Sequence, residues 1–297
     1  MFRFAHISDV HLRPLPKPTF RQLASKRILG YINWKLNRRS FLAGDYLANL
    51  VSDMATKPLE QVVVTGDLVN ISLPAEFINA AKFLKLLGEP EDVFAVCGNH
   101  DAYIPGSLRN AIRAWRPYVS GDGDLMQSAK EYPAVRIRGD IAFIACNSAE
   151  ATLPFFATGY FRRKQAKRLA AILEQHKDKC RVIMIHHPPI RHSTPPHKRL
   201  IGVGRFQKVI AEHGAELVLH GHTHLATQNE IASPNGNVPV ICVPAAGHAR
   251  DINEHPAGRY NLFEIERVQD RWAITMEEYG MARGSDGIGL VARHNLS

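Results

Sequence analysis

The chain has 297 residues with ordinary apolar and charged fractions of 45% and 22%, so we expect a substantial core in one or two domains. No apolar run approaches the roughly 20 residues of a membrane span, and the N-terminus begins directly in a predicted strand, without the apolar core of a signal peptide. The formal net charge of +9 favours an anionic substrate, nucleic acid or a membrane surface, although a solvated basic surface explains the charge alone more simply.

Apolar runs alternate with helical patterns in the first hundred residues. Residues 4–8, 62–65 and 93–97 predict strands, and residues 42–57 and 74–87 predict helices. This alternation is typical of an α/β protein.

Residues 13–41 form an insertion between the first strand and the first helix. Six Lys or Arg residues lie between Arg21 and Arg39, interleaved with large apolar residues: Phe20, Leu23, Ile28, Leu29, Tyr31, Ile32, Trp34, Leu36 and Phe41. We expect these apolar groups to pack on the body or to form a homodimer contact. A further hypothesis is an amphipathic cap that contacts an anionic membrane surface and selects a lipid-linked phosphodiester.

The middle of the chain has weaker patterns. Residues 105–130 are expected to be irregular, residues 135–138 and 141–146 to form a hairpin, and residues 161–175 a basic amphipathic helix. The Pro-, His- and Arg-rich loop at 190–205 is expected to be solvated.

The remaining predicted elements are strands at 181–185, 215–219, 238–243, 259–265 and 272–278, and a short helix at 206–213. Together these patterns predict a single α/β domain over residues 1–280, with a mixed sheet or a pair of sheets. Residues 281–297 are expected to trail over the surface as a C-terminal tail.

The four cysteines lie in or beside apolar runs and show no C-x-x-C spacing: Cys97, Cys146, Cys180 and Cys242. Buried reduced thiols are therefore expected, rather than disulfides or a metal site. We expect a cytoplasmic protein.

Five predicted strands end in Asp, Asn or His. They run into Asp9-Val10-His11, Gly66-Asp67, Gly98-Asn99-His100-Asp101, His186-His187-Pro188-Pro189 and His220-Gly221-His222-Thr223-His224. Ligand sites of α/β sheets lie at the carboxyl ends of strands. Histidines at i and i+2 of an extended segment point the same way, and imidazole binds divalent transition metals. One such strand end is weak evidence, but five of them predict one shared site.

The five blocks, in this order over residues 4 to about 224, resemble the signature of the calcineurin-like metallophosphoesterases. Within that family, the two histidine-rich blocks are most similar to the bacterial class III cyclic-nucleotide phosphodiesterases. The resemblance implies two facing mixed β-sheets flanked by helices, with metals at the strand ends. It also implies hydrolysis of a phosphodiester or phosphomonoester.

The substrate stays open among a cyclic nucleotide, a glycerophosphodiester, a phosphomonoester, a nucleotide-linked lipid and nucleic acid. The alternatives to a small-molecule phosphodiesterase are a nuclease and a catalytically silent scaffold, such as the retromer subunit that resembles this family. Scaffolds on this fold tend to have lost metal ligands, whereas every ligand position is filled here.

Carried over block by block, the resemblance implies two divalent or mixed-valence ions, chosen from Mn, Fe, Zn and Co. Asp9, His11, Asp67 and His224 would hold one ion, and Asp67, Asn99, His186 and His222 the other. A carboxylate has two oxygens, so Asp67 can bridge ions roughly 3.5–4 Å apart that activate a shared water. His100 matches the family's non-ligand histidine, and its expected role is to stabilise the transition state or to protonate the leaving oxygen.

Other polar residues near these blocks have less specific predictions. His187 is expected in a supporting contact or at the substrate. His248 and Arg250 follow an apolar run and are expected to reach the substrate, with a surface position as the alternative. His220 is expected to be a hydrogen-bonded neighbour, and Asp101 either orients His100 or closes a turn.

Overall fold

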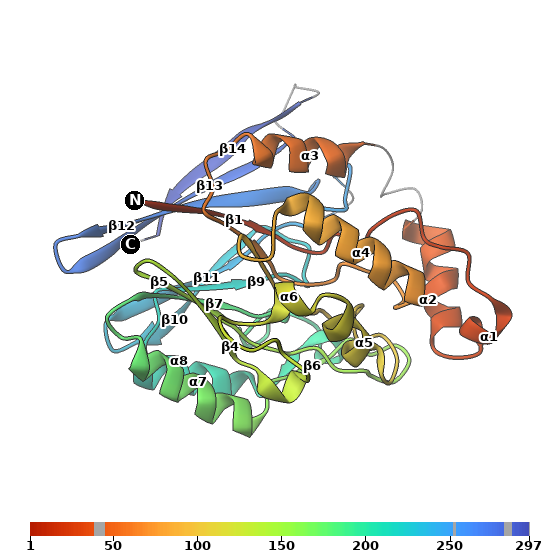
Figure 1. Ribbon diagram of the computed structural model, residues 1–297, viewed down its shortest axis with the longest axis horizontal. Helices are drawn as coiled ribbons and strands as arrows, with labels where there is room; N and C mark the ends of the chain where they lie inside the picture. Colours follow the sequence, from red (N-terminus) through yellow and green to blue (C-terminus); the bar gives the residue numbers. More distant parts are fainter. Residues whose placement is uncertain (39–44, 252–253, 282–286, 297) are drawn as a thin grey trace.

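Two mixed β-sheets form the centre of the molecule, shown in Figure 1 as a computed structural model that describes residues 1–38, 45–251, 254–281 and 287–296. The first sheet contains, from edge to edge, β14 (Ile288–Asn295), β13 (Arg271–Met281), β12 (Arg259–Val268), β1 (Phe2–Ile7), β2 (Gln61–Val64) and β3 (Val93–Ala95). Strands β1, β2 and β3 are parallel, and the other pairings are antiparallel.

The second sheet contains β10 (Thr227–Ser233), β11 (Gly236–Cys242), β9 (Leu217–His220), β7 (Cys180–Met184), β5 (Ile141–Ala145) and β4 (Ala134–Arg138). Its four inner strands are parallel, and β10 and β4 are antiparallel edges. A small parallel pair joins β6 (Gly159–Tyr160) to β8 (Leu200–Ile201). The predicted architecture of facing mixed sheets is confirmed.

Helices flank both sheets (Figure 1). Those on the side of the first sheet are α3 (Tyr46–Ala55) and α4 (Pro74–Leu87), and those on the side of the second are α7 (Arg163–Gln175) and α8 (Val203–His213). The short segments are α1 (Phe20–Leu23), α2 (Arg27–Asn33), the π-helix η1 (Trp34–Arg38), α5 (Ser107–Ala114), α6 (Arg116–Val119) and the 3₁₀ helices η2 (Ala129–Glu131) and η3 (Pro196–Lys198).

Because successive side chains of a strand point to opposite faces, the second sheet contributes residues to two hydrophobic cores. In β7, Val182 and Met184 belong to the core between the sheets, whereas Ile183 packs in the core under α7 and α8. Successive strand residues point to opposite faces, so a strand buried on both sides is apolar throughout. Phe4 of β1 meets Phe143 of β5 edge to face at 5.2 Å, which joins the two sheets.

The expectation of a trailing C-terminal tail is wrong for residues 288–295. These residues form β14, which pairs antiparallel with β13 and provides the edge of the first sheet. The strand is hard to recognise because none of its side chains is fully buried, so the sequence lacks the apolar signal of an inner strand.

The expectation of an irregular segment at 105–130 is also wrong, because it contains α5, α6 and η2. Ala111, Ile112 and Trp115 face the core, and the indole N–H of Trp115 donates to the carbonyl oxygen of Phe77 at 3.0 Å. The surrounding Gly and Pro residues give turn signals that obscure this short amphipathic pattern.

All four cysteines are free and buried, as predicted. No helix within the described ranges has the length and apolar character needed to cross a membrane. The insertion is described up to Arg38, without that residue's side chain, so the predictions that rest on Arg38, Arg39 and Phe41 lie outside the described residues and side chains.

Candidate metal centre

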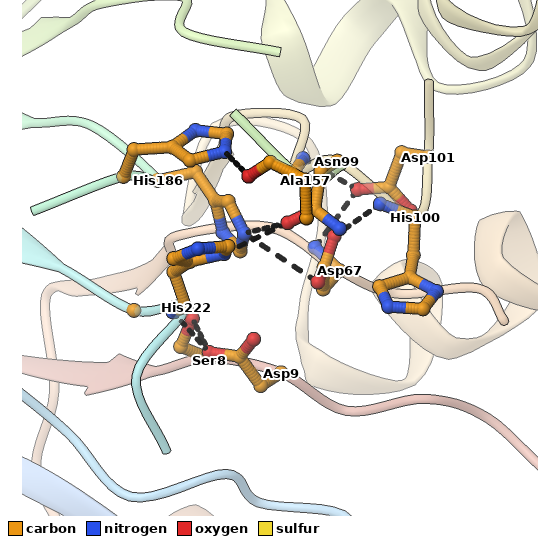
Figure 2. Close-up of polar contacts among 12 residues, drawn as sticks. Ser8, Asp9, Asp67, Asn99, His100, Asp101, Ala157, His186 and His222 are labelled. Carbon is orange, nitrogen blue, oxygen red and sulfur yellow. Dashed lines mark hydrogen bonds and ion pairs between the residues drawn. The ribbon is translucent and has the colours of Figure 1, made fainter. Parts of the chain in front are cut away.

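The five polar blocks follow β1, β2, β3, β7 and β9, and they meet at one end of the two sheets (Figure 2). His186, after β7, donates from Nδ1 to the carbonyl oxygen of Thr65, after β2, at 2.7 Å. The backbone N–H of His222, after β9, donates to Oδ2 of Asp9, after β1, at 2.9 Å. Loops from both sheets therefore build a single site.

Several of the predicted metal ligands also share an unusual backbone conformation. Five of the predicted ligands have positive φ: Asp9 (52°), His11 (45°), Asp67 (55°), His222 (71°) and His224 (61°). The left-handed conformation costs a residue with a Cβ about 1–2 kcal/mol, and such residues cluster at functional sites. The loops thus maintain unfavourable backbone angles where these side chains must converge.

Two glycines of the blocks allow the carboxylates to approach the neighbouring loops. A Cβ on Gly98 would lie 2.1 Å from Oδ1 of Asp67, and one on Gly221 would lie 2.4 Å from Oδ2 of Asp9. Both contacts are too short for any other residue type, so these positions require glycine.

The first ligand group consists of Asp9, His11 and His224, whose candidate ligand atoms all lie within 4.8 Å of one another. Nε2 of His224 is 3.2 Å from Oδ1 of Asp9, and Nδ1 of His11 contacts the carbonyl oxygen of Val69 at 3.1 Å. Because a carbonyl only accepts, Nδ1 of His11 carries the hydrogen, and Nε2 is the nitrogen with a lone pair.

The second group consists of Asn99, His186 and His222. Nε2 of His222 donates to the carbonyl oxygen of Lys198 at 3.0 Å, so Nδ1 is the nitrogen turned toward the site. Burial, with the neighbouring charge of His187, holds the pKa of His222 well below its ordinary value. Its Nδ1 lone pair therefore faces Oδ1 of Asn99 at 2.8 Å.

Asp67 lies between the two groups. Its Oδ2 is 3.4 Å from Nε2 of His186 and 3.9 Å from Nε2 of His11, while Oδ1 accepts a 2.7 Å hydrogen bond from the backbone N–H of His100. Burial alone would raise the pKa of Asp67, but His186, His100 and His11 together hold it well below its ordinary value. Burial alone would lower the pKa of His186, but the charges of Asp67 and Asp9 raise it to about 9.

The donor set fits two divalent cations. Oδ1 of Asp9 is buried and has no hydrogen-bond donor of good geometry, and the Nδ1 lone pair of His222 opposes a carbonyl-type oxygen of Asn99. Converging acceptors of this kind repel one another unless a cation lies between them. Carboxylate, amide and imidazole ligands suit borderline divalent ions, so candidate ligand groups are present although they do not identify the metal.

Comparison with known proteins decides the family. A family model described as calcineurin-like phosphoesterase matches residues 2–226. The chain belongs to this family. It is therefore a metal-dependent phosphoester hydrolase, as the sequence predicts. Over 253 residues, the phosphoesterase is 25% identical to the glycerophosphodiester phosphodiesterase GpdQ of Enterobacter lignolyticus (strain SCF1), a match that covers 82% of this chain and 77% of that protein.

Solved structures support the fold of the phosphoesterase. A dimetal phosphatase from Danio rerio matches with a TM-score of 0.61 and 14% identity, covering 100% of this chain and 98% of that one. Purple acid phosphatase PPD1 from yellow lupin (Lupinus luteus) matches with a TM-score of 0.58 and 12% identity, covering 99% of this chain and 53% of that one. At these identities the likeness concerns the fold alone.

His100 lies beside the ligands of the phosphoesterase. Its Nδ1 donates to the carbonyl oxygen of Asn70 at 2.5 Å, so Nε2 is the nitrogen that would exchange a proton with a substrate. The ring meets His11 edge to face at 4.7 Å and stacks on Tyr103 at 5.6 Å. These contacts fix the imidazole at the edge of the site.

Asp101 closes the turn that begins at Gly98, which is one of its two predicted roles. Its carboxylate accepts from the backbone N–H groups of Asp67, Leu68, Val69 and Gly98, at 2.7–3.1 Å. Burial, together with the charge of Asp67, raises its pKa to about 8. Asp101 thereby joins the loops after β2 and β3, which carry Asp67 and Asn99.

The remaining predicted site residues lie at different depths. His187 is buried, and its ring nitrogens contact Oγ of Ser148 at 2.8 Å and the carbonyl oxygen of Ala157 at 3.2 Å, which favours a supporting contact. His220 is a buried neighbour whose Nδ1 contacts the Gly221 carbonyl at 2.9 Å. Arg250 is exposed, and its contact with substrate stays a prediction.

A cavity of about 760 Å³ opens beside the metal centre, and His248 is among its lining residues. Sequence reasoning missed His255 and Tyr103, which also line it. Lys26, from the insertion hypothesised to be a cap, lines it as well, and so do His197 and Lys198, for which a solvated loop was expected over a substrate contact. His255 stacks edge to face on His224 at 6.0 Å. A histidine seven residues after His248 was the only signal of it in the sequence, and this signal becomes meaningful only with the contact between His255 and His224.

Proposed function

We propose that this phosphoesterase hydrolyses a phosphodiester by attack of water, with two divalent metal ions bound in the site. The observation that supports this most directly is the position of Asp67, whose Oδ2 lies between His11 of one ligand group and His186 of the other. The relative named glycerophosphodiester phosphodiesterase supports a diester over a monoester. Cyclic nucleotides and nucleotide-linked lipids remain within the proposed substrate class.

When bound, two divalent ions would neutralise phosphate charge and lower the pKa of the attacking water. Asp9, His11, Asp67 and His224 would hold one ion, and Asp67, Asn99, His186 and His222 the other. In its imidazolium form, His100 would give a proton to the leaving oxygen from Nε2 and become neutral, because Nδ1 keeps its hydrogen in the bond to the Asn70 carbonyl. Asp101 would keep the loops of Asp67 and Asn99 at a fixed separation through its backbone hydrogen bonds.

The test is hydrolysis of bis(p-nitrophenyl) phosphate and p-nitrophenyl phosphate by purified protein, first stripped with a chelator and then loaded with Mn, Zn, Fe or Co. We expect two metal ions per chain, activity that returns with metal, and a higher kcat/KM for the diester. A fully loaded protein that hydrolyses neither ester would favour the scaffold alternative. A preference for the monoester would refute the diester assignment alone.

We also propose that the 13–38 segment touches an anionic membrane surface. No Asp or Glu lies between Val10 and Gly44, whereas eight Lys or Arg residues do. Basic residues close to anionic lipid contribute about 1 kcal/mol each. The homodimer, the nucleic acid contact and the cytoplasmic location stay predictions of the sequence.

A further inference from the structure

The cavity beside the metal centre has two chemically different walls. One wall carries metal-centre residues, including Asp67, Asn99, His222 and His224. The other carries apolar and aromatic residues: Leu29, Trp34, Ile71, Tyr103, Phe155 and Phe156. A volume of about 760 Å³ is within the range that holds a drug-sized ligand, and far exceeds what a phosphate with a small alcohol would fill.

Four of the six apolar wall residues come from the insertion and from the loop at residues 152–156, which are tied together. Nζ of Lys26, just before α2, donates to Oγ1 of Thr152 at 3.0 Å and to the carbonyl oxygens of Thr152 and Phe156 at 3.2 and 3.1 Å. Nε of Arg27 donates to the carbonyl oxygen of Ile71 at 3.0 Å, which anchors α2 to the body. The wall is thus held by specific hydrogen bonds.

Part of the insertion packs on the body, as one of the sequence alternatives predicts. Tyr31 and Trp34 pack with Leu15, Ile71 and Leu73 in a small separate core. Other apolar side chains of the wall are exposed to solvent: Leu29 is 36% exposed, Phe156 48% and Phe155 81%. Single exposed apolar residues are ordinary, but these three line one cavity next to a catalytic site.

The charges of the cavity suit an anionic ligand. Among the described residues that line it, Asp67 is the only acidic one, and Lys26 and Lys198 are basic. Lys26 also lies over the ring of Tyr103 at 4.7 Å, and that ring stacks on His100. The apolar wall therefore adjoins the residue expected to protonate the leaving group.

We propose that the site takes a phosphoester whose organic group is large and apolar, with that group lying against Leu29, Phe155 and Phe156 and the phosphate at the metal centre. This rests on the proposed phosphodiesterase function. Covering these side chains removes apolar surface from water, which favours binding in proportion to the area. A small polar alcohol such as glycerol would leave the wall exposed. A lipid chain and an aromatic ring both supply the required chemistry.

The test compares methyl, octyl and phenyl p-nitrophenyl phosphates, used below any micelle-forming concentration with the metal-loaded full chain. The leaving group is common to all three, so rates normalised to hydroxide hydrolysis report the other ester group. We expect kcat/KM for the octyl or phenyl diester to exceed that for the methyl diester at least tenfold. A preference for the octyl diester would indicate a lipid-like substrate, and a preference for the phenyl diester would indicate an aromatic one.

Variants connect this preference to the wall. Phe155→Ala and Phe156→Ala should lower kcat/KM about fivefold more for the preferred diester than for the methyl diester. Leu153→Ala is the matched control, because Leu153 is 76% exposed in the same loop and does not line the cavity. Calorimetric titration with octyl, phenyl and methyl phosphate gives a readout without turnover, in which the preferred ester should bind about tenfold more tightly than methyl phosphate.

Equal kcat/KM values for the three diesters, together with equal affinities for octyl, phenyl and methyl phosphate, would overturn the proposal and leave the phosphodiesterase function intact. A preference that survives both phenylalanine variants would overturn the assigned wall. Absence of metal-dependent hydrolysis of all three would instead refute the function on which the proposal rests.

Discussion

Asp67 contacts residues of both ligand groups. Its two oxygens face His11, His186 and the backbone of His100, and its backbone N–H is held by Asp101. An amide at this position would keep the shape but remove the negative charge and one of the two acceptor oxygens. Replacing Asp67 by Asn therefore tests the loss of charge with little change in structure.

We expect Asp67→Asn to lower kcat on bis(p-nitrophenyl) phosphate by at least about 100-fold, comparable with the loss of other key electrostatic groups. Metal content measured on the same sample should fall below two ions per chain. Asp140→Asn, at an exposed turn, is the control and should change neither value. Near-normal turnover with two bound ions would argue against a bridging carboxylate.

The contribution of His100 to the rate of hydrolysis should depend on the leaving group of the substrate. If its Nε2 protonates the leaving oxygen, His100→Ala should slow hydrolysis of an alkyl diester at least about tenfold more than hydrolysis of a nitrophenyl diester, because nitrophenolate leaves without a proton. Metal content should stay close to normal, since His100 is not among the predicted ligands. Equal losses on both esters would assign His100 to charge stabilisation or binding.

The ligands could be predicted from sequence because each lies immediately after an apolar strand, so that local pattern and position coincide. Lys26, Tyr103 and His255 lack such a local signal. Lys26 reaches the site only because it bonds to Thr152, 126 positions along the chain. Contacts of this range depend on tertiary packing, which periodicity in a single sequence does not encode.

At the scale of elements, α2 can pack closely against the site because residue 30 is a glycine, without a side chain. A Cβ on Gly30 would lie 2.5 Å from the Tyr103 hydroxyl oxygen and 2.6 Å from Cγ2 of Ile71. Tyr103 is stacked on His100 and covered by Lys26, so it has little room to move. A glycine inside a helix costs about 1 kcal/mol relative to alanine, and here the close approach explains its presence.

We expect Gly30→Ala to loosen α2, because overpacking costs about 1–3 kcal/mol and exceeds the gain in helix propensity. Chymotryptic cleavage after Phe20, Tyr31 or Trp34 should become at least several-fold faster. Gly204→Ala in α8 is the matched control, since its Cβ would meet only the end of the Arg191 side chain. Slower cleavage in Gly30→Ala would mean that α2 does not pack on Tyr103 and Ile71 in solution.

Strands with mostly buried side chains were predictable, whereas the water-exposed edge strands β10 and β14 were not. β2 and β7 are buried along their whole length, and apart from Gln61 and Arg181 their residues are apolar. β10 reads Thr-Gln-Asn-Glu-Ile-Ala-Ser and is mostly in contact with water, yet it pairs with β11 along seven residues. Backbone pairing at a sheet edge needs no particular side chain, and so it leaves little trace in the sequence.

At the scale of the whole molecule, α1 and α2 project from one end (Figure 1). Phe20 there is 95% exposed and Leu36 75%, and Lys17 and Arg21 are exposed beside them in the chain. Because the segment lacks acidic residues, its apolar and basic groups suit an anionic lipid surface. The side chains of Arg38 and Arg39, farther along this segment, lie outside the described part of the chain, so the test uses Lys17 and Arg21.

We expect the unchanged protein to co-sediment with vesicles containing phosphatidylglycerol at low salt and not with pure phosphatidylcholine. Lys17→Glu with Arg21→Glu should weaken this binding at least about 30-fold, since two basic residues contribute about 2 kcal/mol near anionic lipid. Lys164→Glu with Lys167→Glu, on the exposed side of α7, changes the net charge equally and should weaken binding much less. If the two double variants lose vesicle binding equally, the effect comes from overall charge and not from the segment. If the unchanged protein does not sediment with the vesicles, the proposed membrane contact is refuted.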